Sequence, residues 1–356
     1  MDTKVFERRR ENLKRLLVEK GIPALLVSHA ANRYYLSGFE LHDPQCNESA
    51  GWVVVTARGD DHLFTDPRYI DAALKTWPEA TAHVYTASKH KTVASVLESA
   101  GVTAMGFEPK ALNLFDYDKL KSMVELKSAD NVVEELRIVK DEEELRRMQA
   151  SIELNHRLFR FIEGQLEPGK TEEAIAWEVE RYFRENGAEE LAFSTIVGVG
   201  PNAALPHAIP GQDVVREDEL VLIDTGCRYD DYNSDQTRTF WVGDEPSERF
   251  QRTKALVKEA QQAAIDVIRP GVTFAEAYQA AYGVFEREGV EKQFTHGLGH
   301  GIGLETHEPP SLGRAAKGEL KPGMVVTVEP GLYDPEWGGI RWEYQVVVTE
   351  DGCRIM

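Results

Sequence analysis

The chain has 356 residues with 60 acidic and 41 basic side chains, so its formal net charge is −19. An acidic surface of this kind disfavours non-specific binding to nucleic acids or to anionic membranes. The length predicts two domains rather than one. The N-terminus is charged throughout, and no apolar run approaches the ~18 residues of a membrane span, so we expect a cytoplasmic protein without membrane contact.

The three cysteines are far apart and include no CxxC pair; they are Cys46, Cys227 and Cys353. This pattern indicates neither a disulfide framework nor a zinc ribbon. Cys227 is close to Asp224 in the sequence, and we interpret it as a buried, inert thiol, with oxidation sensitivity as the alternative.

The first part of the chain alternates between predicted helices and strands. Residues 5–20 have the spacing of an amphipathic helix that ends at Gly21. The elements predicted next are strands 23–28, 51–56 and 62–66, helix 66–77, strand 82–87, helix 91–101, strand 102–109 and helix 115–125. This alternation predicts an α/β domain, and we place its boundary near Ser128, giving domains of residues 1–128 and 129–356.

A charged, mostly helical stretch begins at Leu126, and the second part of the chain then changes character. One helix is predicted from about Glu142, and another follows Thr171, a candidate N-cap. The later elements are strands 193–200, 219–226 and 235–243, helices near 247–268 and 273–288, and strands 324–333 and 339–349. Strands and helices cluster separately here, which is typical of an α+β domain.

Two aspartates flank a predicted turn in this second part. Asp224 ends one apolar strand, and Asp235 opens the next. A hairpin of this length can bring both carboxylates to one point. Turn chemistry alone also explains aspartates here, and we assign Asp230 and Asp231 to the turn itself.

The stretch HGLGHGIGLETHE, residues 296–308, carries His296, His300 and His307 among four glycines. The glycines leave little side-chain bulk around His300, which suits a segment that another group approaches closely. A histidine there can bind a metal or contact a substrate. The alternative is a glycine-rich loop with incidental histidines.

Two glutamates lie within the last predicted strands. Glu329 closes an apolar run, where an unpaired charge is costly. Arg341, Glu343 and Gln345 share one face of their strand, which is either a solvent face or a polar site. Asp224, Asp235, His300, Glu329 and Glu343 together suit Mn²⁺, Co²⁺, Fe²⁺ or Zn²⁺, and two such ions would balance the four carboxylates.

These five residues, set in DTG, NSDQTRTF, HGLGHGIGLETHE, VEPGLY and GIRWE, resemble the dinuclear metallopeptidases of the pita-bread fold. That family includes methionine aminopeptidase, aminopeptidase P and prolidase. The phrases NRYYLSGF and FTDPRYIDAA are similar to the creatinase-type N-terminal domain of prolidase and aminopeptidase P. Methionine aminopeptidases usually lack this domain and are therefore disfavoured. The resemblance implies an α/β N-terminal domain followed by an α+β pita-bread catalytic domain.

The resemblance also implies roles for individual residues. Asp224 would bind one metal, Asp235 and Glu343 would bridge both, and His300 and Glu329 would complete the second site. A bridging hydroxide would attack the scissile carbonyl, with Glu329 as general base. Four further residues match positions that contact or orient the substrate or the metal ligands: His207, His296, His307 near the oxyanion, and Arg341 beside Glu343.

The implied activity is hydrolysis of the bond before proline, and we favour an Xaa-Pro dipeptidase. The alternative is aminopeptidase P, which acts on longer peptides; Arg314 is one candidate reader of a dipeptide carboxylate. Metal-free creatinase-like hydrolases and non-enzymatic relatives are disfavoured because all five ligand positions are present. A homodimer is expected. One departure is that Trp342 and Tyr344 flank Glu343 where the family usually has Ile and Asp, an aromatic pair that could line a pocket or a subunit contact.

Overall fold

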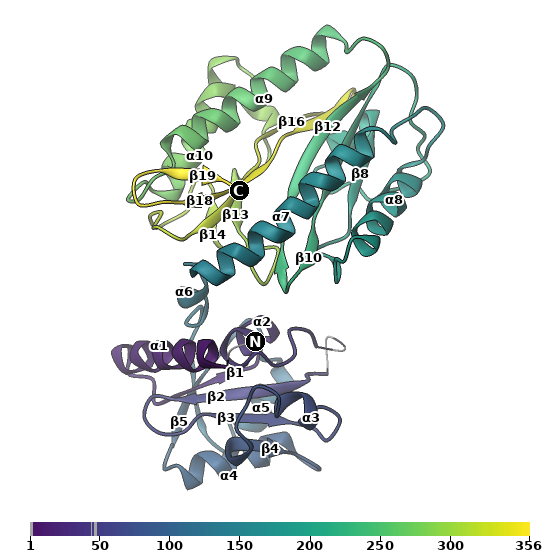
Figure 1. Cartoon of the computed structure of the whole chain (residues 1–356). Coiled ribbons are helices and arrows are strands. Elements are labelled where there is room, and N and C mark those ends of the chain that lie inside the picture. The colour runs from purple at the N-terminus through teal and green to yellow at the C-terminus, as the bar shows by residue number, and fades with distance from the viewer. Residues whose placement is uncertain (1–2, 44, 46–47) are drawn as a thin grey trace. The chain divides into compact units, whose positions relative to one another are not determined.

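The computed structural model describes residues 3–43, 45 and 48–356, and Cys46 lies outside the described residues. The chain forms two compact units, unit 1 (residues 1–137) and unit 2 (residues 138–356) (Figure 1). Every described helix is too short or too polar to cross a lipid bilayer.

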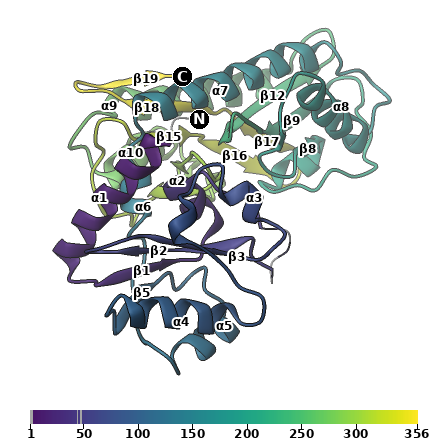
Figure 2. The same ribbon diagram turned by 60° about the horizontal axis from the view of Figure 1, so that its bottom comes forward.

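Unit 1 is a six-stranded mixed sheet with the strand order β4-β3-β2-β1-β5-β6. Its strands are β1 (Ala24–Val27), β2 (Gly51–Thr56), β3 (His62–Thr65), β4 (Ala82–Val84), β5 (Ala104–Phe107) and β6 (Glu125–Ser128). Its helices are α1 (Lys4–Lys20), α2 (Ala30–Ser37), α3 (Ile70–Ala73), α4 (Lys89–Ser99), α5 (Leu114–Leu120) and α6 (Glu134–Arg137), with a 3-10 turn at Glu79–Thr81. Helices α1 and α2 lie on one face of the sheet, and α4 and α5 lie on the other (Figure 2). The predicted α/β character of this part is confirmed.

Two predicted elements of unit 1 were wrong in extent or type. The helix expected over residues 66–77 is limited to α3, because turns occupy residues 67–69 and 74–76. The Asp66 carboxylate accepts the backbone N–H of Arg68 at 2.8 Å, a local bond that competes with a longer helix. Residues 125–128, expected to be helical, form β6 because they pair in parallel with β5 at the sheet edge.

The end of unit 1 lies nine residues beyond Ser128, the boundary expected from the sequence. Residues 129–137 pack against the first two helices. Arg137 Nη1 donates to Asn32 Oδ1 at 2.6 Å, and Lys20 Nζ contacts Glu135 Oε1 at 2.8 Å. These contacts attach α6 to unit 1 after the last strand has ended.

Unit 2 contains four long helices and several small antiparallel sheets. The helices are α7 (Glu142–Glu163), α8 (Glu172–Glu185), α9 (Glu248–Val267) and α10 (Phe274–Arg287), with 3-10 turns at Gly200–Ala204 and Glu291–Gln293. The first strands are β7 (Glu190–Leu191), β8 (Ile196–Val199), β9 (Glu219–Thr225), β10 (Cys227–Tyr229), β11 (Tyr232–Asn233) and β12 (Gln236–Val242). The later strands are β13 (Gly299–Gly301), β14 (Glu308–Leu312), β15 (Val325–Val328), β16 (Gly331–Asp334), β17 (Gly338–Arg341), β18 (Tyr344–Val348) and β19 (Cys353–Ile355). The expected cap is present, since Thr171 Oγ1 accepts the N–H of Ala174 at 3.1 Å.

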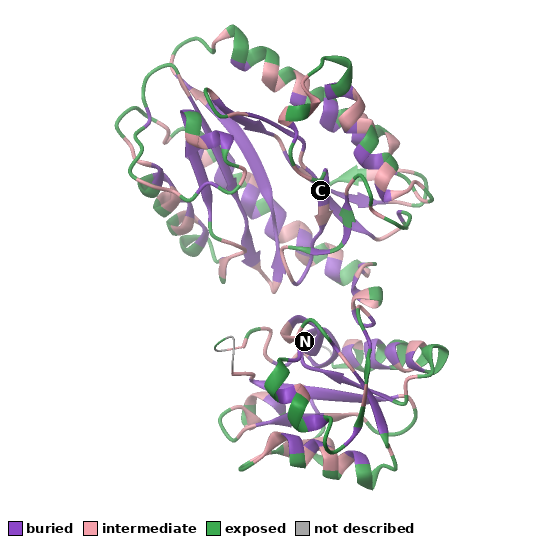
Figure 3. Ribbon diagram, turned by 180° about the vertical axis from the view of Figure 1, so that it is seen from behind, coloured by how far each residue is buried: buried purple, intermediate pink, exposed green. Residues whose placement is uncertain are grey.

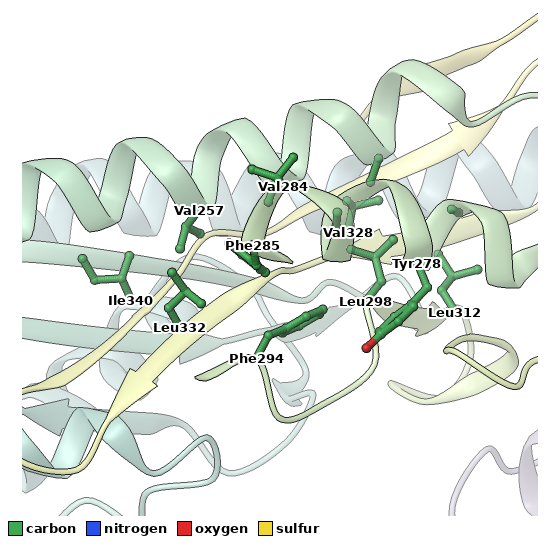
Figure 4. Close-up of a cluster of buried hydrophobic side chains, with 14 of the residues drawn as sticks. Val257, Tyr278, Val284, Phe285, Phe294, Leu298, Leu312, Val328, Leu332 and Ile340 are labelled. Carbon is green, nitrogen blue, oxygen red and sulfur yellow. The ribbon is translucent and has the colours of Figure 1, made fainter. Parts of the chain in front are cut away.

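The strands of unit 2 lie between two apolar cores. Along β9, Leu220 and Leu222 belong to the core beneath α9 and α10, whereas Val221 and Ile223 belong to the core beneath α7 and α8. This alternation follows the two-residue period of a strand. Figure 3 shows the long strands of unit 2 largely buried, and Figure 4 shows the α9–α10 core, where side chains such as Phe285 and Phe294 meet.

Each of the last two predicted strands is in fact two strands separated by a break. The β15–β18 pair ends at Val328 opposite Tyr344, and the β16–β17 pair begins at Gly331 opposite Arg341. Pro330 has no N–H to give to a ladder, so regular pairing is interrupted there. The expectation that Glu343 lies within a continuous strand was therefore wrong: Glu329 and Glu343 both lie in the breaks.

Candidate metal centre

Three carboxylates converge where β9 and β12 meet the break before β18. Asp224 lies near the end of β9 and faces Thr237 in register, while Asp235 directly precedes β12. One ligand oxygen from each of Asp224, Asp235 and Glu343 lies within 4.8 Å of the others, and all three residues are buried. The Asp230–Asp231 pair forms the distant turn as expected, with φ values of 53° and 71°.

His300 and Glu329 complete this group. His300 Nε2 lies 3.5 Å from Asp235 Oδ2 and 3.4 Å from Glu329 Oε1. His300 Nδ1 donates to Gly301 O at 2.9 Å, which leaves the Nε2 lone pair facing the carboxylates. We call Asp224, Asp235, His300, Glu329 and Glu343 the carboxylate–histidine cluster.

The glycines around His300 allow β13 to pack closely against the neighbouring strands. A Cβ on Gly299 would lie 2.0 Å from Thr327 O, and one on Gly301 would lie 2.2 Å from Pro309 O. Only glycine lets β13 approach its neighbours this closely. The group that closely approaches this segment, as expected from the sequence, is therefore the backbone of the neighbouring strands.

The cluster carries more negative charge than its protein surroundings balance. Burial, then repulsion from Glu343 and Asp224, raises the pKa of Asp235 well above its ordinary value. Burial, then Glu329 and Asp224, likewise raises the pKa of Glu343, and burial raises the pKa of Glu329 to about 7. Asp224 Oδ1 and Glu343 Oε1 are buried and have no hydrogen-bond partner among the described residues. The donor set therefore consists of four carboxylates, two of which have an unpartnered oxygen, and one imidazole. Such a set fits divalent cations.

Arg341 connects the cluster to a neighbouring histidine. Arg341 Nη2 donates to Asp224 Oδ2 at 2.6 Å, and its Nη1 donates to Tyr333 Oη at 2.7 Å. His296 Nδ1 donates to Gly297 O at 2.7 Å, so its Nε2 accepts from the Tyr333 hydroxyl at 2.8 Å. Burial, assisted by the Arg341 charge, lowers the pKa of His296 to about 4. Arg341 is 2% exposed, so the solvent-face interpretation of its row of residues was wrong.

A cavity of about 650 Å³ opens over the cluster. His207, His296, His307 and Arg341 line it together with cluster residues, so the structure brings the four expected substrate-facing side chains to one place. The His307 and His300 rings lie 4.2 Å apart. Apolar residues complete the wall: Phe193, Ile196, Pro206, Ala208 and Ile209. Arg314 lies over the ring of Tyr282 and is not among the lining residues.

Three residues near the cluster were not singled out as functional by the sequence reasoning. Thr327 Oγ1 donates to Glu329 Oε1 at 3.0 Å and accepts the His300 N–H at 3.0 Å. Thr237 Oγ1 donates to Glu343 Oε2 at 2.8 Å, and Tyr333 links His296 to Arg341. The available signal was spacing, because each threonine lies two residues from a cluster member on a strand.

The residues that depart from the family pattern face away from the cavity. Trp342 and Tyr344 contact the guanidinium of Arg238, whose Cζ lies 4.5 Å from each ring centroid.

Cys227 is fully buried beside Ser151 and Ser234, and burial raises the pKa of its thiol to about 11. A thiol in this environment is a poor nucleophile.

Comparison with known proteins identifies the family. The model of metallopeptidase family M24 matches residues 146–350, and the creatinase/prolidase N-terminal domain matches residues 9–139. The chain therefore belongs to metallopeptidase family M24, and the predicted family and fold class are confirmed.

Full-length relatives support the same assignment. An Xaa-Pro dipeptidase from Pyrococcus furiosus is 33% identical over 98% of this chain and 97% of the relative. The structure of an Xaa-Pro dipeptidase from Bacillus anthracis superposes with a TM-score of 0.92 at 31% identity, covering 98% of this chain and 97% of the other. An X-Pro aminopeptidase from Thermotoga maritima superposes with a TM-score of 0.84 at 31% identity, covering 96% and 97%. The chain is thus a peptidase whose relatives include both kinds of proline-directed enzyme.

Proposed function

We propose that this chain is an Xaa-Pro dipeptidase, which hydrolyses the bond before proline in dipeptides. The observation that carries the proposal is the carboxylate–histidine cluster at the floor of a cavity lined by His207, His296 and His307. Full-length similarity to proteins named as Xaa-Pro dipeptidases supports the choice of substrate.

The cluster is proposed to hold two divalent ions, drawn from Mn²⁺, Co²⁺, Zn²⁺ and Fe²⁺. In this assignment Asp224, Asp235, His300, Glu329 and Glu343 would hold the ions. When bound, the ions polarise the scissile carbonyl and lower the pKa of water. Arg341 orients Asp224 through its 2.6 Å hydrogen bond and contributes to the substrate-facing wall.

Glu329 is proposed to move the proton. The proline nitrogen is a tertiary amide without N–H, and it leaves as a secondary amine, so it needs one proton as the C–N bond breaks. Glu329 accepts that proton from the attacking water and passes it to the leaving nitrogen. The hydrogen bond from Thr327 holds the Glu329 carboxylate in place for both transfers.

The three cavity histidines are proposed to bind the substrate. Burial lowers the pKa of His307, so its ring is neutral and donates one N–H to the developing oxyanion. His207 lines the same wall, and His296, fixed by Tyr333 and Gly297, faces the second substrate residue. The fixed histidine donors and the apolar residues of the cavity wall favour a single binding pose for a small peptide.

The second candidate function is that of aminopeptidase P, which the similarity to the Thermotoga maritima X-Pro aminopeptidase supports. Turnover of an Xaa-Pro dipeptide and of an Xaa-Pro-Xaa tripeptide should be compared after chelation and after adding Mn²⁺, Co²⁺ or Zn²⁺. Metal-restored cleavage of the dipeptide alone supports the dipeptidase. Restored cleavage of the tripeptide moves the assignment to aminopeptidase P, and no cleavage of either contradicts proline specificity.

We further propose a cytoplasmic homodimer that binds neither nucleic acid nor membrane. We assign catalysis to residues 129–356, preceded by a creatinase-type domain in residues 1–128. The net charge of −19 supports the proposed lack of binding to nucleic acid and to membranes. Light scattering after gel filtration tests the dimer, and a mass equal to one chain would contradict it.

A further inference from the structure

Glu329 and Glu343 lie in breaks between strands, outside the regular ladders. The backbone N–H of Glu329 donates to Leu298 O at 2.9 Å, and that of Glu343 donates to Thr237 O at 3.3 Å. Both breaks receive hydrogen bonds from one side chain of α9. Gln261 Nε2 donates to Val328 O at 2.8 Å and to Trp342 O at 2.9 Å. These carbonyls belong to the residues directly before Glu329 and Glu343. Gln261 is 3% exposed, so a single buried amide ties the two breaks together.

A second side chain reaches the same place from β12. Thr237 faces the carboxylate–histidine cluster, so its neighbour Arg238 faces the opposite side of the strand. Arg238 Nη1 donates to Thr237 O at 2.7 Å and to Glu343 O at 2.5 Å. Its guanidinium lies between the rings of Trp342 and Tyr344, the two residues that flank Glu343.

Glu343 is thus held on both sides of its strand break. Thr237 Oγ1 binds Glu343 Oε2 on the cavity side, and Arg238 binds Glu343 O on the other. The remaining oxygen, Oε1, has no partner among the described residues. A metal site requires ligand positions within about 0.5 Å of the productive geometry, which in turn requires such support.

We propose that Gln261 and Arg238 are positioning residues for the metal centre. Gln261 sets the spacing of Glu329 and Glu343, and Arg238, stacked between Trp342 and Tyr344, fixes the backbone of Glu343. The aromatic pair thereby keeps Arg238 in place instead of lining a pocket. This inference rests on the proposed function, because it assumes that both glutamates bind divalent ions.

The test uses the full-length chain stripped of metal and titrated with Co²⁺ in a calorimeter. Gln261→Leu removes both donors at similar size, and Gln262→Leu, an exposed neighbour on α9, is its matched control. Arg238→Lys keeps the charge and loses the planar fork. Its control is Arg249→Lys, because Arg249 is also stacked on a tryptophan, with Cζ 4.3 Å from the Trp337 ring.

We expect Gln261→Leu and Arg238→Lys to weaken Co²⁺ binding by about 10–100-fold, the usual loss for residues that orient metal ligands. kcat for an Xaa-Pro dipeptide should fall in parallel while KM changes by less than about threefold, because the cavity histidines are untouched. Both controls should match the wild type. Tyr344→Asp, which gives Arg238 a carboxylate partner in place of a ring, should retain Co²⁺ affinity.

Two results would overturn the inference while leaving the proposed function intact. The first is a lower Tm for Gln261→Leu and Arg238→Lys with wild-type Co²⁺ affinity and kcat, since that pattern indicates a structural role only. The second is a loss of Co²⁺ affinity in the controls Gln262→Leu and Arg249→Lys as large as that in Gln261→Leu and Arg238→Lys. A wild-type chain that binds no Co²⁺ would overturn the proposed metal centre and this inference together.

Discussion

Units 1 and 2 each bury a glutamate, and the two side chains are treated in opposite ways. Glu108 in unit 1 is 6% exposed, and Glu343 in unit 2 is 1% exposed. Glu108 Oε2 accepts the backbone N–H groups of Ser28 and His29 at 2.6 and 2.7 Å, and its Oε1 accepts from Asn32 at 2.7 Å. Glu343 has one oxygen bonded to Thr237 and the other unpartnered among the described residues.

Burial raises the pKa of both carboxyl groups, so burial alone does not distinguish their roles. The difference is in what surrounds them. Glu108 meets the N–H donors of Ser28 and His29 just before α2, whereas Glu343 lies among other carboxylates. A buried carboxylate whose bonds are completed by protein donors is structural, and one aimed at other carboxylates is built for cations.

The largest expected effect follows from removing one cluster charge. Asp235→Asn should lower kcat/KM for an Xaa-Pro dipeptide by at least about a thousandfold, because metal ions supply several kcal/mol of transition-state stabilisation. The Tm of the metal-free protein should stay level or rise, since repulsion within the cluster is relieved. Activity assays and thermal unfolding after chelation measure both. Asp230→Asn, in the half-buried turn between β10 and β11, is the control, and equal losses in the two variants would contradict the cluster assignment.

The second prediction separates the two units by adding metal. Co²⁺ at a hundredfold excess over its Kd should stabilise the protein by about 2.7 kcal/mol. Hydrogen–deuterium exchange should slow in β9 and β12 of unit 2 and stay unchanged in β1 and β2 of unit 1. Equal protection of both units would mean that the cluster is not the site of binding.

The third prediction applies to the buried glutamate of unit 1. Glu108→Gln keeps the size but turns one acceptor into a donor that faces N–H groups, so unfolding free energy should fall by about 2 kcal/mol. Co²⁺ affinity should not change. Urea unfolding and calorimetry measure the two quantities, with the exposed Glu98→Gln as control. A loss of Co²⁺ affinity in Glu108→Gln would remove the distinction between the two glutamates.

The smallest expected effect is the pH dependence that one histidine pair of unit 1 contributes. His62 Nδ1 and His83 Nε2 share a hydrogen bond of 3.1 Å, and burial lowers the pKa of both rings. The folded state therefore binds fewer protons than the unfolded state, so this stability is present above about pH 6.5 and is lost as the pH falls through the lowered pKa values. The loss should stay under about 1 kcal/mol because both rings are partly exposed. Urea midpoints between pH 7.5 and 5 measure it, and His83→Gln should flatten the profile; an unchanged profile would contradict this origin.

Much of the chain could be predicted from local pattern. Apolar periodicity identified α1, α7, α8, α9 and α10, because amphipathic helices carry their burial pattern in the sequence itself. Asp224, Asp235, His300, Glu329 and Glu343 indicated a divalent-metal site, since each carboxylate or imidazole stands beside an apolar segment where an unpaired charge is costly. Their order and surrounding motifs resembled those of metallopeptidases, and that resemblance supplied the activity.

Only the tertiary structure decided how those residues meet. The edge strand β6 exists because β5 is there to pair with it, and local helical preference gave the opposite expectation. Glu329 and Glu343 lie in strand breaks, and long-range side-chain bonds to those breaks come from Thr237, Arg238 and Gln261, which lie 67–106 residues away in the chain. A sequence specifies which residue types are available, but contacts over such separations depend on the folded arrangement of β12, α9 and the final sheet, which local periodicity does not encode.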